Sequence, residues 1–158
     1  QSKTKLDTIN NFSKKIKIAT KNRVSDDFLI IARLESLIVG QGINEAIKRA
    51  NKYSKAGADM ILVHSKKNTP NEIFKFAKKF KKSKFFKPLV AVPSAYPSVK
   101  EAQLVKNGFK LVIYANHLLR ASYLSMFETA KNILKNKRAK ESEKKMISIK
   151  KIIELIEW

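Results

Sequence analysis

The sequence predicts an α/β fold made of four consecutive strand-to-helix units, and three observations support this prediction. Short apolar runs without polar alternation recur along the chain, as in parallel strands covered on both faces. Segments with apolar residues three and four positions apart follow these runs, as in amphipathic helices. With 158 residues and 44% hydrophobic content, the chain can also bury the core of one ordinary domain or of a piece of a larger one.

The first predicted elements are a helix over 7–21, whose apolar side chains share one face, and a strand over 28–32. Residues 22–27 interrupt the pattern between them. A helix over 44–56 follows, and Gly57 is suited to end it because glycine adopts the left-handed conformation without strain.

The next two units repeat this order of strand and helix. A strand is predicted over 60–63 and a helix over 70–82, where Thr69 and Glu72 have the spacing of a capping box. A third strand is predicted over 89–92.

The fourth unit completes the series. Ser98 and Glu101 form a second capping box, and the helix that they open ends at Gly108. A strand over 111–114 then leads into a long helix that ends near Lys135.

The end of the chain differs in composition. Residues 136–145 are almost wholly charged and predict a linker, whereas Ser148 caps a short terminal helix with one isoleucine stripe. We therefore divide the chain into a helix plus four units over 1–135, a charged linker over 136–147 and a terminal helix over 148–158. Because so short a helix is marginal alone, we expect it to dock on its own domain or on a partner subunit.

Four such units require parallel strands joined by right-handed crossovers. They fit either a doubly wound sheet or part of a (β/α)8 barrel. Neither a G-x-G-x-x-G string nor a Walker loop follows any predicted strand, which disfavours a nucleotide-binding fold.

The formal net charge of +21 comes from 29 lysines and 5 arginines against 13 acidic residues. Lysine is a solvated point charge, whereas arginine reads phosphate and guanine through a bidentate fork. The excess of lysine over arginine disfavours nucleic acid as a partner and is typical of solvated outer faces. A basic nucleic-acid-binding module is the alternative function, from another class of protein. The positive field would also attract a small anionic substrate.

Several classes of protein are disfavoured by features that the sequence lacks. No apolar stretch approaches the roughly 20 residues that cross a bilayer, and no secretory signal is visible. The absence of cysteine excludes a disulfide framework and cysteine-based metal sites. We expect a cytoplasmic protein with no membrane partner, whose glutamine start has been trimmed or belongs to a longer protein.

Arg33 and His64 are the candidate catalytic residues, because each ends an apolar strand where the functional groups of barrels gather. A cation there needs an anionic partner, which is either a substrate or a carboxylate such as Glu35. His64 is either a functional donor or a satisfied core residue. Ser94 and Asn116 also follow strands and are candidate substrate-binding residues, although Asn116 could instead cap the long helix.

Four strings at matching separations resemble the phosphoenolpyruvate mutase family, within the isocitrate lyase and phosphoenolpyruvate mutase superfamily. They are A-R-x-E at 32–35, A-G-A-D at 56–59, H-S-K at 64–66 and A-N-H-x-L-R at 115–120. The likeness spans nearly all 158 residues. It implies the C-terminal half of a (β/α)8 TIM barrel, with four βα units plus a C-terminal helix.

The resemblance implies an isomerase of phosphonate biosynthesis that interconverts phosphoenolpyruvate and phosphonopyruvate, with Mg²⁺ on the pyruvoyl oxygens. Arg33 falls on the family's active-site arginine, and His64 falls on a histidine that can donate to the transferring group. The family's magnesium carboxylates and gating loop lie upstream of the matched segment. We therefore assign no metal ligand here, and we expect the Mg²⁺ ligands in a missing N-terminal half.

Further expectations follow from the resemblance. It implies a small anionic substrate and a homo-oligomer, a dimer or a tetramer, whose subunits exchange their final helices. Phosphonopyruvate hydrolase shares most of the strings and stays an alternative, and a C–C lyase of the same superfamily is a weaker one. Because half a barrel has open edges, we expect the isolated chain to aggregate, dimerise or need its other half, and to be inactive alone.

Overall fold

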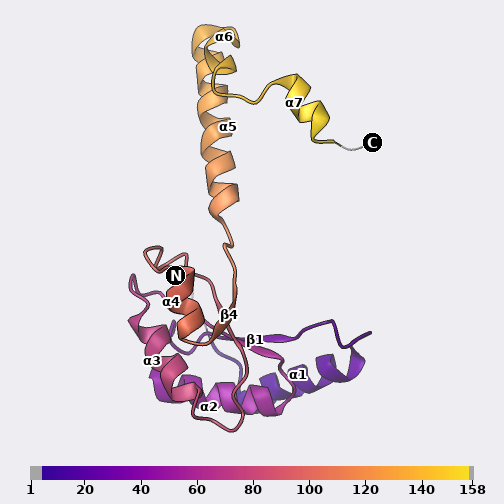
Figure 1. Cartoon of the computed structure of the whole chain (residues 1–158), viewed down its shortest axis with the longest axis vertical. Coiled ribbons are helices and arrows are strands. Elements are labelled where there is room, and N and C mark those ends of the chain that lie inside the picture. The colour runs from indigo at the N-terminus through magenta and orange to yellow at the C-terminus, as the bar shows by residue number, and fades with distance from the viewer. Residues whose placement is uncertain (1–4, 157–158) are drawn as a thin grey trace. The chain divides into compact units, whose positions relative to one another are not determined.

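The computed structural model describes residues 5–156. The chain divides into two compact units, the first ending at Ala115 and the second beginning at Asn116. The helices and strands, most of which are labelled in Figure 1, are α1 (Ile9–Asn22), β1 (Ile31–Leu34), α2 (Gly42–Lys55), β2 (Met60–Val63), α3 (Asn71–Phe80), β3 (Leu89–Ala91), α4 (Glu101–Lys106), β4 (Phe109–Val112), α5 (His117–Asn136), α6 (Lys140–Glu143) and α7 (Ile149–Glu154).

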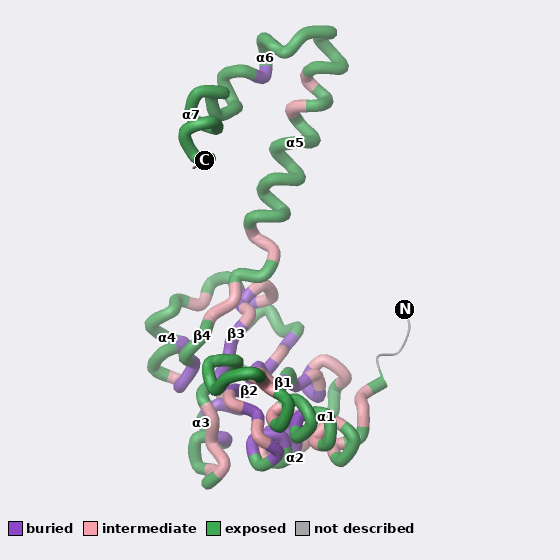
Figure 2. The backbone as a smooth tube through the Cα atoms, turned by 90° about the vertical axis from the view of Figure 1, so that its right-hand side faces the viewer, coloured by how far each residue is buried: buried purple, intermediate pink, exposed green. Residues whose placement is uncertain are grey.

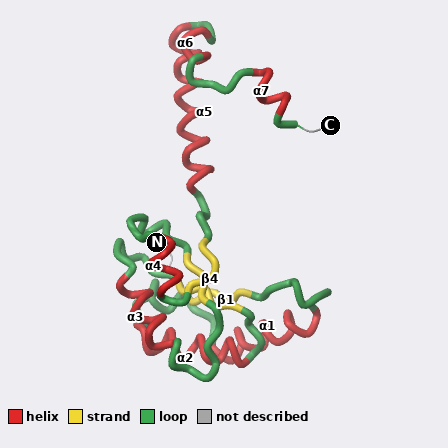
Figure 3. Tube along the Cα trace, in the orientation of Figure 1, coloured by secondary structure: helices red, strands yellow, loops and turns green. Residues whose placement is uncertain are grey.

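The four strands form one parallel sheet in the order β1-β2-β3-β4, drawn in yellow in Figure 3. In the first pair, Arg33 lies opposite Leu62 and Leu34 lies opposite Val63. The order in space follows the order in the chain, whereas a doubly wound sheet reverses at a switch point. The predicted α/β fold is confirmed, and its strand order is that of part of a (β/α)8 barrel.

The two faces of the sheet carry separate apolar clusters. One face belongs to the main core, which also includes residues of α1, α2, α3 and α4; its strand members are Ala32, Leu34, Ile61, Val63, Leu89, Ala91 and Phe109. The opposite face holds a smaller buried cluster of Met60, Leu62 and Val90. The division follows the alternation of side chains along each strand.

The prediction that the strands are covered on both faces is right only for the centre of the sheet. Every residue of β2 and β3 is buried. β1 and β4 lie at the edges, where Arg33, Lys110 and Leu111 are exposed. An edge strand has one neighbour only, so its side chains have less cover from flanking side chains than those of a central strand.

The first strand begins later than predicted. Phe28 and Leu29 are exposed and precede β1, and the next residue, Ile30, is bonded to Asp59. The Asp59 carboxylate accepts a hydrogen bond from the backbone N of Ile30 at 2.8 Å and pairs with Arg23 at 3.3 Å. By contrast, the strand predicted over 60–63 has these bounds in the structure.

Both predicted capping boxes are wrong. α3 begins at Asn71 without a side-chain cap, and the Glu72 carboxylate accepts a hydrogen bond from the Ser65 hydroxyl instead. α4 begins at Glu101 rather than directly after Ser98. The Glu72 carboxylate, which the sequence pattern predicts at the helix terminus, therefore bonds to a residue outside α3.

The second unit consists of α5, α6 and α7, and neither α5 nor α7 contains a buried residue, so that both are drawn without purple in Figure 2. The stretch predicted as a linker contains α6, in which Glu141 forms an ion pair with Arg138. Ser148 caps α7 as predicted, since its side chain accepts from the backbone N of Lys151. Within residues 5–156, no helix is both long and apolar enough to cross a membrane.

We expect Ile73→Ala to lower the free energy of unfolding by about 2–5 kcal/mol, because Ile73 of α3 is fully buried and its truncation leaves a cavity. Ile18→Ala is the matched control: the same side chain is 63% exposed on α1, and we expect a change within about 0.5 kcal/mol. Urea unfolding followed by circular dichroism measures both. Equal effects of the two substitutions would contradict the packing of α3.

Candidate active site

Three polar side chains gather at the carboxyl ends of β1 and β2. Arg33 lies opposite Leu62 in the register, so the two share one face of the sheet. Because side chains alternate, Glu35 continues the face of Arg33, and His64 continues the face of Leu62. The two predicted catalytic residues, 31 positions apart in the chain, are thereby brought together.

The Arg33 guanidinium contacts both of its neighbours. Its Nε donates to the Glu35 carboxylate, and its Nη2 lies 2.7 Å from His64 Nδ1. His64 Nδ1 also lies 3.1 Å from Oε1 and 3.2 Å from Oε2 of Glu35. The side chain of Arg33 is 51% exposed, so its remaining donors can meet an anion from solvent although the ion pair with Glu35 is formed.

His64 Nδ1 cannot serve both neighbours in one protonation state. A guanidinium only donates, so the contact with Arg33 requires an unprotonated Nδ1. A carboxylate only accepts, so the contact with Glu35 requires a protonated one. The cluster therefore has two hydrogen-bonding states, and in the neutral state bound to Arg33 the proton lies on Nε2, which is then a donor.

The loop after β2 is tied to α3 behind His64. Ser65 is fully buried, and its hydroxyl donates to Glu72 while accepting from the backbone N of Lys67 at 3.2 Å. These bonds fix the residue that follows His64 and thereby limit where the imidazole can lie. The sequence pattern predicted Glu72 as a helix cap and did not indicate that it bonds to Ser65.

A hollow of about 190 Å³ lies beside Arg33 and Glu35. Its lining includes Arg49, which is only 8% exposed and donates to Glu45 and to the backbone O of Asp7, each at 3.0 Å. This buried guanidinium ties α2 to the segment before α1. Sequence reasoning missed Arg49, although its spacing from Glu45 is that of a helical ion pair.

Ser94 and Asn116 are not joined to this cluster by the structure. Ser94 follows β3, and its buried hydroxyl has no hydrogen-bond partner among the described residues. Asn116 belongs to the second unit, at the N-cap position of α5, and its side chain makes no capping bond there. The substrate-binding roles of both residues stay predictions.

The described residues do not fit a magnesium site. Within residues 5–156, no group of three or more His, Cys, Asp or Glu side chains lies together as a metal site would require. Mg²⁺ takes carboxylate and water oxygens in an octahedron, and the carboxylate nearest to His64, that of Glu35, is occupied by Arg33.

Comparisons with known proteins give a consistent result. Residues 1–134 match the family described as phosphoenolpyruvate phosphomutase. The chain is 41% identical over 148 residues to a phosphonopyruvate hydrolase of Variovorax sp. (strain Pal2), covering 93% of this chain and 50% of that protein. It is 39% identical over 147 residues to a phosphoenolpyruvate phosphomutase of Tetrahymena pyriformis, covering 93% and 48%.

A solved structure supports the assignment of the fold. A phosphonopyruvate hydrolase in complex with oxalate and Mg²⁺ matches with a TM-score of 0.89 and 40% identity, covering 98% of this chain and 54% of that one. The chain thus spans about half the length of the curated relatives it matches.

Tyr96, in the loop that also holds Ser94, gives a pH-dependent test of this region. Burial raises the pKa of its phenol to about 12, whereas an unfolded tyrosine ionises near 10. Between these pH values the unfolded state loses a proton that the folded state keeps, so stability falls by about 1.4 kcal/mol per pH unit from this group.

We therefore expect wild type to lose stability relative to Tyr96→Phe as the pH rises from about 10 to about 12. Tyr123→Phe, at a 66% exposed position, is the control and should follow wild type. Urea unfolding across this pH range measures the difference. Parallel pH profiles of wild type and Tyr96→Phe would contradict the burial of this phenol.

Proposed function

The chain belongs to the phosphoenolpyruvate phosphomutase family, and from that premise we propose that it is part of a mutase that interconverts phosphoenolpyruvate and phosphonopyruvate. The observation that carries the proposal is the contact of Arg33 with His64 at the ends of adjacent parallel strands. Such an enzyme makes the P–C bond from which phosphonate biosynthesis starts.

The proposed reaction moves one phosphoryl group within the substrate. In phosphonopyruvate, the P–C bond breaks with its electron pair going to C3, which leaves the enolate of pyruvate. The phosphoryl group passes through a metaphosphate-like state, and the enolate oxygen on C2 then bonds to phosphorus to give phosphoenolpyruvate. No atom is gained or lost, so the protein has to orient and stabilise charge.

Arg33 and His64 are suited to this task. The guanidinium can present two parallel N–H donors to phosphoryl oxygens, and His64 Nε2 can donate a third hydrogen bond when Nδ1 accepts from Arg33. Glu35 carries a negative charge that opposes an anionic substrate. Its favourable role is therefore to orient the guanidinium through Nε and to hold the imidazole.

Magnesium enters the proposal through a relative, since the hydrolase structure is a complex with oxalate and Mg²⁺. When bound, the ion would neutralise charge on the pyruvoyl oxygens. Because residues 5–156 do not form a site for it, we propose that its ligands lie outside them and assign these residues no part in holding the ion.

Phosphonopyruvate hydrolase is the second candidate, because the chain is 41% identical to such an enzyme. In that reaction, a water oxygen bonds to phosphorus in place of the enolate oxygen. Phosphate is released, and C3 of the enolate takes up a proton to give pyruvate. The same Arg33 and His64 donors would serve both reactions, so the access of water decides between them.

A cytoplasmic homo-oligomer with exchanged terminal helices completes the proposal. α5 has no buried residue, and α7 exposes Ile149, Ile152 and Ile153 by 79%, 43% and 57%. Apolar side chains of this number are normally covered in the native assembly. The stripe on α7 suits a neighbouring subunit.

We expect the full-length protein, with Mg²⁺, to convert phosphonopyruvate to phosphoenolpyruvate, followed by ³¹P NMR. Phosphate and pyruvate as the first products would mean that the protein is the hydrolase and not the mutase. If neither product forms while the protein is folded, both candidate activities are wrong.

We expect Arg33→Ala to lower kcat/KM by about 100-fold or more, because one fixed donor to a developing oxyanion is worth that much. Arg33→Lys should recover only part, since an ammonium cannot form the bidentate contact. Arg138→Ala, which breaks an exposed ion pair on the second unit, is the matched control and should leave the rate unchanged. Wild-type kinetics in Arg33→Ala would remove Arg33 from the site.

A further inference from the structure

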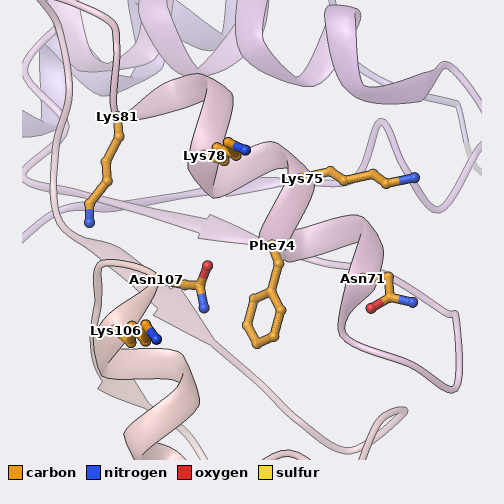
Figure 4. A pocket seen from close by; sticks show the side chains of 7 residues that line it. All are labelled: Asn71, Phe74, Lys75, Lys78, Lys81, Lys106 and Asn107. Carbon is orange, nitrogen blue, oxygen red and sulfur yellow. The ribbon is translucent and has the colours of Figure 1, made fainter.

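A second hollow, of about 360 Å³, lies between α3 and α4 and shares no residue with the Arg33 cluster (Figure 4). Its lining combines three kinds of side chain: one aromatic ring, two carboxamides and four lysines. The members are Phe74, Asn71, Asn107, Lys75, Lys78, Lys81 and Lys106.

The four lysines are not neutralised. Lys75, Lys78 and Lys81 recur at intervals of three along α3 and its end, which places them on neighbouring parts of one helix surface, and Lys106 ends α4. No acidic residue lines the hollow. Within the part of the chain that the structure describes, none of the four lysines forms an ion pair. Like charges this close repel one another, and a bound anion would relieve the repulsion.

The stem of Lys81 passes close to a glycine. A Cβ at Gly108 would lie 3.1 Å from Cε of Lys81, so the lysine stem crosses the open space that the glycine leaves. Gly108 has φ +91°, a conformation that other residues rarely adopt. Figure 4 shows the ammonium of Lys81 pointing toward the side of the hollow where Lys106 and Asn107 lie.

Phe74 gives the hollow an apolar surface between the two carboxamides. The ring packs partly against the main core, and Figure 4 shows it extending between Asn71 and Asn107. Asn107 Nδ2 already donates to the backbone O of Gln103 at 2.8 Å, which leaves its Oδ1 to accept. The hollow thus offers a stacking surface and hydrogen-bonding groups beside the positive charge.

We infer that this hollow binds a nucleoside polyphosphate. The lysines supply point charges for the phosphates, the Phe74 ring supplies a stacking surface for the base, and carboxamides pair with base edges. A volume of about 360 Å³ lies within the range of ligand pockets, at its small end. The site is a surface hollow between helices, so it needs no glycine-rich loop after a strand.

The chain contains a matched comparison for the role of charge alone. A hollow of about 350 Å³ lies against α1 and α2 and is also lined by four lysines, Lys14, Lys17, Lys52 and Lys55. No aromatic ring lines it. If positive charge were sufficient, the two hollows would bind alike.

The test is calorimetric titration of the full-length protein with ATP, inorganic triphosphate and adenosine at moderate salt. We expect one ATP site that Lys78→Gln/Lys81→Gln/Lys106→Gln weakens by about tenfold or more. The control Lys14→Gln/Lys17→Gln/Lys52→Gln should change ATP affinity by less than about twofold. Phe74→Leu, which keeps an apolar side chain, should weaken ATP about fivefold or more and leave triphosphate unchanged.

Four results would overturn the inference. Equal losses in the two triple variants would mean attraction by general charge, as would binding of an RNA oligonucleotide that depends on both hollows. Triphosphate binding as tight as ATP, with no effect of Phe74→Leu, would exclude recognition of the base. Loss of ATP binding in Arg33→Ala would place the nucleotide in the candidate active site. Because none of the lysines lies at that site, turnover of phosphonopyruvate tests the proposed function separately.

Discussion

The parallel pairing of β1 with β2 is the constraint on which the candidate site depends. The register sets Arg33 opposite Leu62, and alternation then brings Glu35 and His64 to the same face. If β1 slipped by one residue against β2, the side chains of β1 would change faces, and Arg33 would lie on the face that α2 covers. The buried core members of both strands, Leu34 and Val63 among them, make that slip costly, because it would expose them.

The cluster is nearly neutral within a strongly basic chain. The charge of Arg33 is offset by Glu35, while the chain as a whole carries +21. Attraction of an anionic substrate is therefore a property of the whole surface, whereas its orientation depends on a few hydrogen bonds. Because His64 Nδ1 can accept from Arg33 or donate to Glu35, an anion that competes for the guanidinium would also change the hydrogen bonding of the imidazole.

Sequence patterns predicted the parts of the structure that depend on local periodicity. A continuous apolar run ending at His64 placed β2, and the common direction of parallel strands brought Arg33 to the same edge. The patterns could not predict side-chain partners that arise only in three dimensions. Glu72 bonds to Ser65 instead of capping α3. Glu35 is one of the two predicted partners of Arg33, but its additional contact with His64 follows from the register rather than from composition.

A double-mutant cycle on kcat/KM for phosphonopyruvate, with Arg33→Ala, His64→Ala and the double variant of the full-length protein, tests the central claim most directly. If both side chains act on one phosphoryl group, the double variant should lose much less than the product of the two single losses. Losses that multiply would show that the two residues act independently, and the single site described for them would be wrong.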